Sequence, residues 1–420
     1  MPYTPHRVRS SVADMSTPVL DSRTAWLRLA ITLLIGTVGN VGMWAVIVVM
    51  PSVQAEFGVD RADATLTYTL TMVGFAAGNY LIGRAVDRFG ITRALIGAAL
   101  GVSAGFALAA VSGSLWAMTA LHLLIGLGTA ASFGPIIADV SQWFDKRRGI
   151  AVAIAASGNY LSGALWPMLL KGVLADHGWR GAYLVLAVCV AGIVVPLALT
   201  LRRRVPSAET ARVAAAAQSR AQTTRMSPAR LQVILVLAGV ACCVAMSMPQ
   251  VHIVSFCVDL GYGPAVGAEM LSLMLLGGVA SRLVSGMLAD RLGGVPTLLI
   301  GATLQCVALF LYLPFDGLVS LYVVSLIFGL SQGGIVPSYA IIVREYLPPQ
   351  EAGARVGFVM MATIVGMALG GWMSGWIYDV TGSYSWAFLN GIAWNFLNIG
   401  LILLLVLRRD ARPKTPAQPA

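Results

Sequence analysis

Twelve long apolar runs alternate with short polar segments along the chain. The first six fall near residues 27–50, 64–83, 91–111, 116–138, 149–172 and 181–201, and the second six near 231–256, 265–288, 295–314, 319–342, 355–378 and 384–407. A helix needs about 20 mostly apolar residues to cross a bilayer. Backbone polar groups in lipid must be satisfied internally, and the runs lack the alternation of barrel strands. The pattern therefore predicts an all-α polytopic membrane protein with twelve transmembrane helices.

The composition agrees with a membrane protein and excludes an ordinary soluble enzyme. Of the 420 residues, 58% are hydrophobic and 11% are charged, whereas soluble domains have about 45–50% apolar and about 25% charged residues. The sequence contains no Gly-x-x-x-x-Gly-Lys loop, no His-Glu-x-x-His pair and no clustered metal ligands, so we expect no cofactor, no metal site and no ATP-driven step. The five cysteines lie in or beside apolar runs, as buried free thiols do.

The distribution of cations predicts the orientation. Of the 28 Lys and Arg residues, 24 fall in the tails or in loops on one side of the predicted spans, and the exceptions are Arg61, Lys171, Arg180 and Arg282. Cytoplasmic loops carry such an excess of cations, so we expect a multi-pass protein of the cytoplasmic (inner) membrane with both termini in the cytoplasm. The net charge of +10 then fits loops beside anionic lipid without binding of nucleic acid.

Five segments follow from these spans. We expect a cytoplasmic tail over 1–26, a six-helix bundle over 27–201, a cytoplasmic loop over 202–229, a second six-helix bundle over 230–407 and a cytoplasmic tail over 408–420. The first apolar run is longer than the hydrophobic core of a secretory signal and lacks a small-residue cleavage site, so it is interpreted as an uncleaved span.

The two halves repeat each other at an offset of 203 residues. Gly83-Arg-Ala-Val-Asp87-Arg88-Phe-Gly90 follows the second span, and Gly286-Met-Leu-Ala-Asp290-Arg291-Leu-Gly293 follows the eighth. This loop resembles the signature of the major facilitator superfamily. The resemblance implies two pseudo-symmetric six-helix bundles and a monomer. It also implies that the Asp caps the next helix while the Arg pairs across the cytoplasmic face, as a latch on the outward-open state; a solvated charge cluster is the alternative.

A second resemblance lies at the entrance to the fifth span. An aromatic-Phe-x-basic-Arg-Arg run leads into a helix of small residues, with Trp143, Phe144, Lys146, Arg147, Arg148 and Gly158 at the matching positions. This run is similar to the signature of the monocarboxylate transporters, which have the oxalate/formate antiporter-like proteins as neighbours. It departs from that signature at Ala153, where the family has Gly, and a generic basic loop remains the alternative interpretation.

Arg282 is the one charge predicted to lie deep in a span. An arginine cannot lose its proton there, and burying it unpaired is costly. Because no predicted span contains a deep Asp or Glu, we hypothesise that its partner is the cargo, an organic carboxylate bound bidentately by the guanidinium. Alternatively, Arg282 binds helix carbonyls or faces a wet cavity.

The resemblance assigns the same role to Arg282, because monocarboxylate transporters have a carboxylate-binding Arg in span eight. The animal members also have an Asp four residues earlier, where this chain has Gly278, which puts their route of proton coupling in doubt. The Lys of span one in those proteins and the Lys of span eleven in the antiporters are both absent here. A single cation favours a monocarboxylate over a dicarboxylate.

Further candidate substrate contacts are polar or aromatic residues of probable cavity helices. The repeat offset relates Arg282 to Asn79, which precedes Tyr80. His252 is either a proton relay or a hydrogen-bonded gate residue. For each of these residues packing is the competing explanation, and the rest of the set is Asn40, Asn159, Tyr160, Tyr339 and Trp376.

The sequence therefore predicts a secondary transporter that moves a small organic monocarboxylate by alternating access. Whether a proton accompanies the anion is left open. The alternatives are an exchanger of other organic anions and an efflux pump for amphiphilic or drug-like compounds. A non-transporting sensor and an enzyme fit less well, because the tails are short and the motifs of enzymes are absent.

Overall fold

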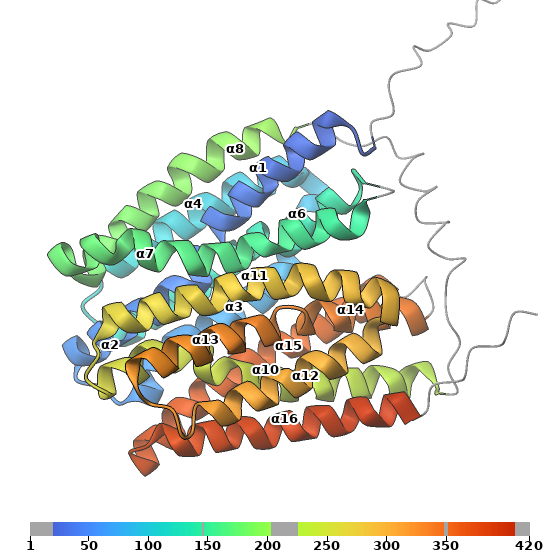
Figure 1. Ribbon diagram of the computed structural model, residues 1–420. Coiled ribbons are helices and arrows are strands. Elements are labelled where there is room, and N and C mark those ends of the chain that lie inside the picture. The colour runs from blue at the N-terminus through green and yellow to red at the C-terminus, as the bar shows by residue number, and fades with distance from the viewer. Residues whose placement is uncertain (1–19, 145–146, 203–225, 348–351, 408–420) are drawn as a thin grey trace, which may run out of the picture.

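The computed structural model describes residues 20–144, 147–202, 226–347 and 352–407. This part is built from helices and contains no β-strand (Figure 1). The N half, residues 20–202, comprises α1 (Arg23–Gly39), α2 (Val41–Phe57), α3 (Arg61–Phe89), α4 (Ile91–Ala110), α5 (Leu115–Thr129), η1 (Ala130–Ser132), α6 (Gly134–Ser141), α7 (Arg148–Cys189), η2 (Val190–Val194) and α8 (Val195–Thr200). The C half, residues 226–407, comprises α10 (Pro228–Asp259), α11 (Pro264–Leu292), α12 (Gly294–Leu311), α13 (Leu318–Gln332), α14 (Ile335–Tyr346), α15 (Ala352–Thr381) and α16 (Tyr384–Leu407).

Each of the twelve apolar runs is helical over most of its length. Ten helical segments of the described residues are long and apolar enough to cross a membrane. One of them, Ile150–Thr200, has 51 residues and covers two of the predicted runs. A kink at Gly178, where the backbone leaves the helical region (φ 64°, ψ −170°), separates these two runs. Helix α3 supplies the remaining run, and its threonines and charged ends make it less apolar than the others. The all-α polytopic architecture is thus confirmed.

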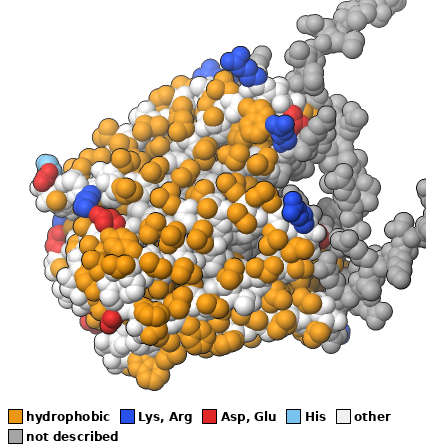
Figure 2. All heavy atoms as spheres, viewed as in Figure 1, with side chains coloured by type: hydrophobic (Ala, Val, Ile, Leu, Met, Phe, Trp, Pro, Cys, Tyr) orange, Lys and Arg blue, Asp and Glu red, His pale blue; other side chains and the backbone are white. Residues whose placement is uncertain are grey.

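The helices run side by side, and the described chain begins and ends at the same end of the bundle (Figure 1). We name this the terminal end, where α1 begins and α16 ends, and the opposite one the distal end, where α2 ends and α3 begins. Figure 2 shows hydrophobic side chains over the middle of one face, with the charged side chains gathered toward the two ends. An apolar belt between charged rims is the surface that a bilayer-spanning bundle presents.

Several helices are interrupted near the middle of the bundle. Asn40 separates α1 from α2, and its side-chain amide donates to the carbonyls of Gly36 (2.7 Å) and Ser132 (2.8 Å). Gly333 and Gly334 separate α13 from α14. Interrupted helices expose backbone polar groups inside the protein, which is where transporters place their binding sites.

The two halves share local backbone geometry at positions 203 residues apart. Gly90 (φ 85°, ψ 159°) and Gly293 (φ 84°, ψ 170°) each end a helix in a conformation that only glycine adopts readily. The N–H of each donates to the carbonyl four residues earlier at 2.8 Å. A Cβ placed on Gly126 would lie 2.0 Å from the carbonyl oxygen of Thr71, and one on Gly329 would lie 2.0 Å from that of Met274. These loops and helix crossings are therefore built alike.

Candidate functional site

Arg282 lies on α11 between the two halves, and its side chain is 6% exposed. Its Nη1 donates to the carbonyl of Ala156 on α7 at 2.6 Å, and its Nε donates to the carbonyl of Gly333 at 3.2 Å. The guanidinium also lies over the ring of Tyr160, 4.1 Å from the centroid. Arg282 therefore connects the C half to the N half through the Ala156 carbonyl and the Tyr160 ring, while the Gly333 carbonyl holds it within its own half.

Both hydrogen-bond acceptors of Arg282 are neutral. The other buried arginines of the described chain have carboxylate partners: Arg28 pairs with Asp139 (2.8 Å), and Arg61 pairs with Asp259. A guanidinium has five N–H donors, and a carboxylate binds it more strongly than a carbonyl does. In this structure Arg282 therefore binds backbone carbonyls, which was the alternative to a carboxylate partner. Its positive charge is still not neutralised.

Asn159, Tyr160 and Asn40 form a connected wall next to Arg282. Tyr160 packs edge-on against Trp44, with ring centroids 6.4 Å apart. The indole N–H of Trp44 donates to the carbonyl of Asn159 at 2.9 Å, and the side-chain amide of Asn159 donates to that of Asn40 at 3.3 Å. These contacts fix Tyr160 under the guanidinium.

Four other candidate residues make no contact with Arg282. The amide of Asn79 donates to the Phe75 carbonyl of its own helix at 2.8 Å. Tyr80 is 64% exposed, and Trp376 is 50% exposed. Tyr339 is buried within the C half, where its hydroxyl donates to Asn398 at 2.9 Å. Their assignment as substrate contacts stays a prediction.

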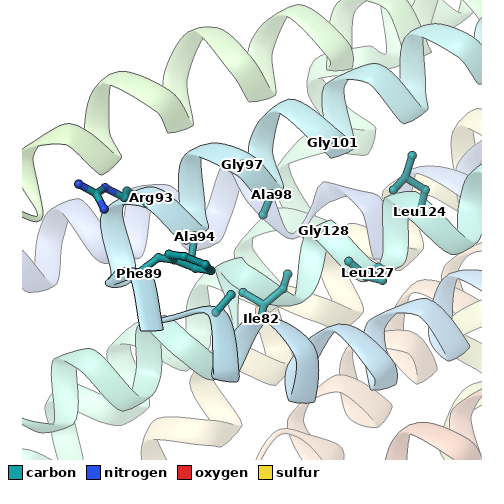
Figure 3. A pocket seen from close by; sticks show the side chains of 11 residues that line it. Ile82, Phe89, Arg93, Ala94, Gly97, Ala98, Gly101, Leu124, Leu127 and Gly128 are labelled. Carbon is teal, nitrogen blue, oxygen red and sulfur yellow. The ribbon is translucent and has the colours of Figure 1, made fainter. Parts of the chain in front are cut away.

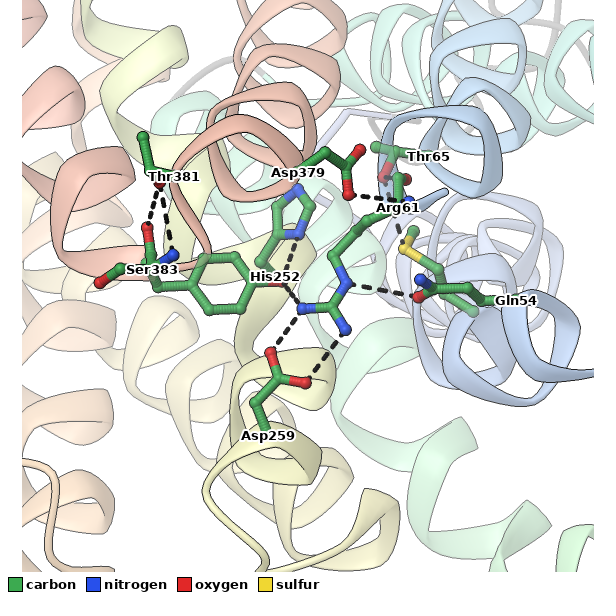
Figure 4. A network of polar contacts seen from close by, with 10 residues as sticks. Gln54, Arg61, Thr65, His252, Asp259, Asp379, Thr381 and Ser383 are labelled. Atoms are coloured by element: carbon green, nitrogen blue, oxygen red, sulfur yellow. Dashed lines mark hydrogen bonds and ion pairs between the residues drawn. The ribbon is translucent and has the colours of Figure 1, made fainter. Parts of the chain in front are cut away.

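A network of polar contacts at the distal end joins the two halves (Figure 4). Arg61, in the first turn of α3, donates through Nη2 to Asp259 of α10 at 3.0 Å and through Nη1 to the Tyr384 hydroxyl of α16 at 3.0 Å. Its guanidinium lies over the Tyr378 ring of α15, 4.1 Å from the centroid. Asp379 of α15 accepts from the backbone N–H groups of Arg61 (3.1 Å) and Ala62 (2.7 Å).

His252 belongs to this distal network and makes no contact with Arg282. Its Nε2 lies 2.8 Å from the Gly371 carbonyl, which can only accept, so Nε2 carries the proton. Its Nδ1 therefore accepts from the Tyr384 hydroxyl at 3.0 Å. The sequence alone assigned no role to Arg61 or Asp259. The available signal was that Arg61 is one of few cations on that side of the spans.

The aromatic residues of the 143–158 motif anchor the beginning of α1. Trp143 and Phe144 are buried in a cluster with residues of α1, α6 and α7. Arg28 lies over the Trp143 ring at 4.6 Å, and Trp26 packs edge-on against Phe144 at 5.1 Å. The motif therefore contributes to packing at the terminal end.

The remaining motif residues are only partly described. Gly158 lets α7 approach α1, since a Cβ there would lie 3.1 Å from the Gly36 backbone. Gly83 and Gly286 lie inside α3 and α11, and Arg88 and Arg291 are exposed. The side chains of Asp87, Lys146, Arg148 and Asp290 lie outside the described residues, so the latch stays a prediction.

An apolar groove of about 480 Å³ lies between α3, α4 and α5 (Figure 3). Arg93 is the one charged residue of its lining, and it lies at one end of the groove. The rest of the lining is apolar, with Gly97 and Gly101 on α4 and Leu124 and Leu127 on α5. A groove of this kind provides few polar groups to orient an anion, so the buried arginine is the better candidate site.

The fold and the buried site together define a multi-pass membrane carrier built from two repeated halves. The model of the Major Facilitator Superfamily matches residues 32–315 and 258–420. The chain therefore belongs to the major facilitator superfamily, as its loop signature predicted.

Named relatives narrow this assignment. Monocarboxylate transporter 13 of Rattus norvegicus is 30% identical over 350 residues, which covers 78% of this chain and 78% of the relative. Monocarboxylate transporter 11 of Homo sapiens is 28% identical over 383 residues, covering 84% of this chain and 77% of the relative. This chain is thus a membrane transporter that resembles the monocarboxylate transporters.

The fold also matches a solved structure. A bacterial homologue of the human lysosomal transporter Spinster, in an inward-facing and occupied conformation, superimposes with a TM-score of 0.69. The match covers 95% of this chain and 100% of that chain at 13% sequence identity. At this identity the match concerns the fold alone.

Proposed function

We propose that this transporter carries a small organic monocarboxylate and binds its carboxylate at Arg282. The observation that supports this most directly is a buried guanidinium, held between the halves, whose hydrogen-bond acceptors are both neutral carbonyls. An anionic substrate would provide the missing negative charge. The similarity to proteins named monocarboxylate transporters is consistent with this class of substrate.

The contacts of Arg282 suggest how binding is linked to movement of the halves. A carboxylate that takes both ends of the guanidinium fork competes with the carbonyls of Ala156 and Gly333, because charge-assisted bidentate bonds are stronger than neutral ones. Arg282 belongs to the C half and Ala156 to the N half, so release of the Ala156 carbonyl loosens the connection between the halves. Tyr160 would continue to support the face of the guanidinium.

The orientation follows from the cation distribution. We place the terminal end in the cytoplasm of a cell with an inner membrane and the distal end outside, as the excess of Lys and Arg predicts. The polar contacts across the distal end then make this a state that is closed to the outside. Alternating access requires these contacts to break when the site opens outward.

Coupling to a second ion is a separate question. Arg282 has no carboxylate among its contacts, and Gly278 occupies the position of the Asp found in the animal proteins. We therefore expect that any coupled proton binds away from Arg282. Exchange of one monocarboxylate for another needs no proton-binding residue, and it is the alternative mode of transport.

The test is uptake into proteoliposomes of radiolabelled lactate, pyruvate, acetate and oxalate, with one amphiphilic drug-like anion included. Truncating one partner of a buried charge pair costs roughly 2–5 kcal/mol, so Arg282→Gln should lower uptake of a monocarboxylate by about a hundredfold. Arg282→Lys should recover little, because an ammonium cannot form the bidentate fork.

Arg93→Gln provides the matched control, since it removes an exposed arginine of the apolar groove between α3, α4 and α5. Each uptake is measured with and without an inward proton gradient. Uptake of a monocarboxylate by Arg282→Gln at the wild-type rate would contradict the proposal. Preferred transport of oxalate or of the amphiphilic anion would favour the exchanger or the efflux pump.

A further inference from the structure

The apolar groove between α3, α4 and α5 is accessible from the outer surface of the N half. Phe89 and Leu124, which line it, are 49% and 41% exposed. Gly97 and Gly101 line it along α4, and a Cβ built on either of them would meet no atom within 4 Å. These glycines therefore bring no other described helix close to α4, and the space beside them is open.

The corresponding surface of the C half is built from larger side chains. At the offset of 203 residues, Gly97 and Gly101 correspond to Ile300 and Leu304, whose side chains are 40% and 50% exposed. The residue that corresponds to Arg93 is a proline. The repeated fold therefore requires neither the two glycines nor the arginine, and at these positions only the N half combines them.

The groove has about the length of one bilayer leaflet. Arg93 lies in the first turn of α4, at the terminal end, and Gly101 follows it by eight residues on the same helix. A rise of 1.5 Å per residue separates them by roughly 12 Å along the helix. Half of a hydrocarbon core of about 30 Å is roughly 15 Å, so a chain that starts at the level of Arg93 can follow the groove through most of one leaflet.

Arginines lie at the terminal end of this groove (Figure 3). Arg93 is exposed, and it forms no ion pair with another described residue. Arg88 lies over the ring of Phe89, 5.2 Å from the centroid, and Phe89 lines the groove. A guanidinium binds phosphate oxygens through two parallel hydrogen bonds. The groove therefore has an apolar wall for a hydrocarbon chain and a cationic end for a phosphate.

We propose that this groove binds one anionic phospholipid, with its phosphate at Arg93 and an acyl chain along Gly97 and Gly101. A zwitterionic phospholipid has the same chains but carries a cation next to its phosphate, so it binds more weakly. A soluble phosphate compound has no chain and leaves the apolar wall uncovered. An apolar helix from a second copy of the protein would cover the glycines and leave Arg93 without an anion.

The test measures binding of lipids to the full chain in detergent by native mass spectrometry. Phosphatidylglycerol is compared with phosphatidylcholine of the same acyl chains, and glycerol phosphate is added as a competitor that has the anion without the chains. We expect one phosphatidylglycerol to bind about tenfold more tightly than phosphatidylcholine, because arginines at the membrane surface attract anionic lipid. Glycerol phosphate at the same concentration should not displace it.

Two variants separate the contribution of the headgroup from that of the chain. Arg93→Gln removes a charge-assisted contact, so it should lower the affinity for phosphatidylglycerol about tenfold and leave that for phosphatidylcholine unchanged. The double variant Gly97→Ile, Gly101→Leu introduces the residues that the C half has at these positions, and it should lower the affinity for both lipids.

Two matched controls change the same residue types outside the groove. Arg230→Gln removes an exposed arginine in the first turn of α10, at the same end of the bundle. Gly400→Leu adds a leucine at an exposed position of α16, where a Cβ would meet no atom within 4 Å. Both controls should bind the two lipids as the wild type does.

Four results would overturn the proposal. Arg93→Gln, or the variant with the filled groove, binds phosphatidylglycerol as tightly as the wild type does. Arg230→Gln weakens binding as much as Arg93→Gln, which would indicate a general surface charge. Glycerol phosphate displaces the lipid, which would indicate an anion site without a chain. The wild type forms a dimer that the filled groove converts to a monomer, which would assign the groove to a second copy.

The lipid site is independent of the carboxylate site at Arg282. Lipid binding is measured without substrate, and uptake by the control variant Arg93→Gln is measured in phosphatidylcholine vesicles, which contain no anionic lipid. Only the assignment of the lipid to the cytoplasmic leaflet rests on the orientation given in the proposed function. Loss of the lipid site would leave the role of Arg282 intact, and uptake that does not depend on Arg282 would leave the lipid site intact.

Discussion

Replacing Gly329 with alanine inserts a methyl group where α13 crosses α11. The built Cβ lies 2.0 Å from the Met274 carbonyl oxygen, and real Cβ contacts are essentially never below 3.0 Å. The helices must therefore separate by about 1 Å, which as overpacking costs about 1–3 kcal/mol. Gly126→Ala imposes the same clash on the Thr71 carbonyl in the N half. We expect the two variants to lose similar amounts of stability.

Function should separate these two variants. Helix α11 carries Arg282, so moving it changes the position of the guanidinium relative to Ala156 and Gly333, whereas α3 carries no contact to Arg282. We expect Gly329→Ala to reduce uptake of a monocarboxylate more than Gly126→Ala does. Stability is measured by denaturant titration in detergent micelles, and uptake is measured in proteoliposomes at equal amounts of reconstituted protein.

Gly97→Ala is the control for the glycine substitutions, because its Cβ would meet no atom within 4 Å. It should change the unfolding free energy by less than about 1 kcal/mol, with a stabilising sign if the helix propensity of alanine dominates. If Gly329→Ala proves as stable as Gly97→Ala, the helices can separate without cost, and the argument from close packing is wrong.

Two further predictions concern the loops and the ion pairs. Gly90→Ala and Gly293→Ala should each destabilise the protein by about 1–3 kcal/mol, because alanine does not readily adopt their positive φ; equal stability to wild type in denaturant titration would contradict this. Asp139→Asn should cost about 1.5–3 kcal/mol by weakening two hydrogen bonds from buried Arg28, and Glu269→Gln less than about 1 kcal/mol. A larger loss for Glu269→Gln in the same assay would refute the ranking by burial.

Sequence periodicity located the helices but not their interruptions. The run of residues 27–50 predicts one span, yet Asn40 divides it, and its side-chain amide donates to the Gly36 carbonyl of α1 and to the Ser132 carbonyl of η1. The amide reaches Ser132, which is 92 residues away. A contact at that distance along the chain leaves no local pattern.

The repeat offset was informative for glycines and less so for side chains. It relates Gly90 to Gly293, and the structure gives both the same backbone conformation. It also relates Arg282 to Asn79, yet Asn79 bonds its own helix while Arg282 reaches across to α7. Backbone geometry follows the repeated fold, whereas a side-chain contact depends on which neighbour each half presents.

By itself, the sequence determined that this chain is an all-α membrane protein with twelve apolar runs, with the loop signature of its superfamily and one deep arginine. These features are local, since hydrophobic length and charge placement are set within each segment. The tertiary structure alone decided that Tyr160 supports Arg282 and that Arg61 meets Asp259 and Tyr384. Those partners come from helices more than a hundred residues apart, and only the packing of the two halves brings them together.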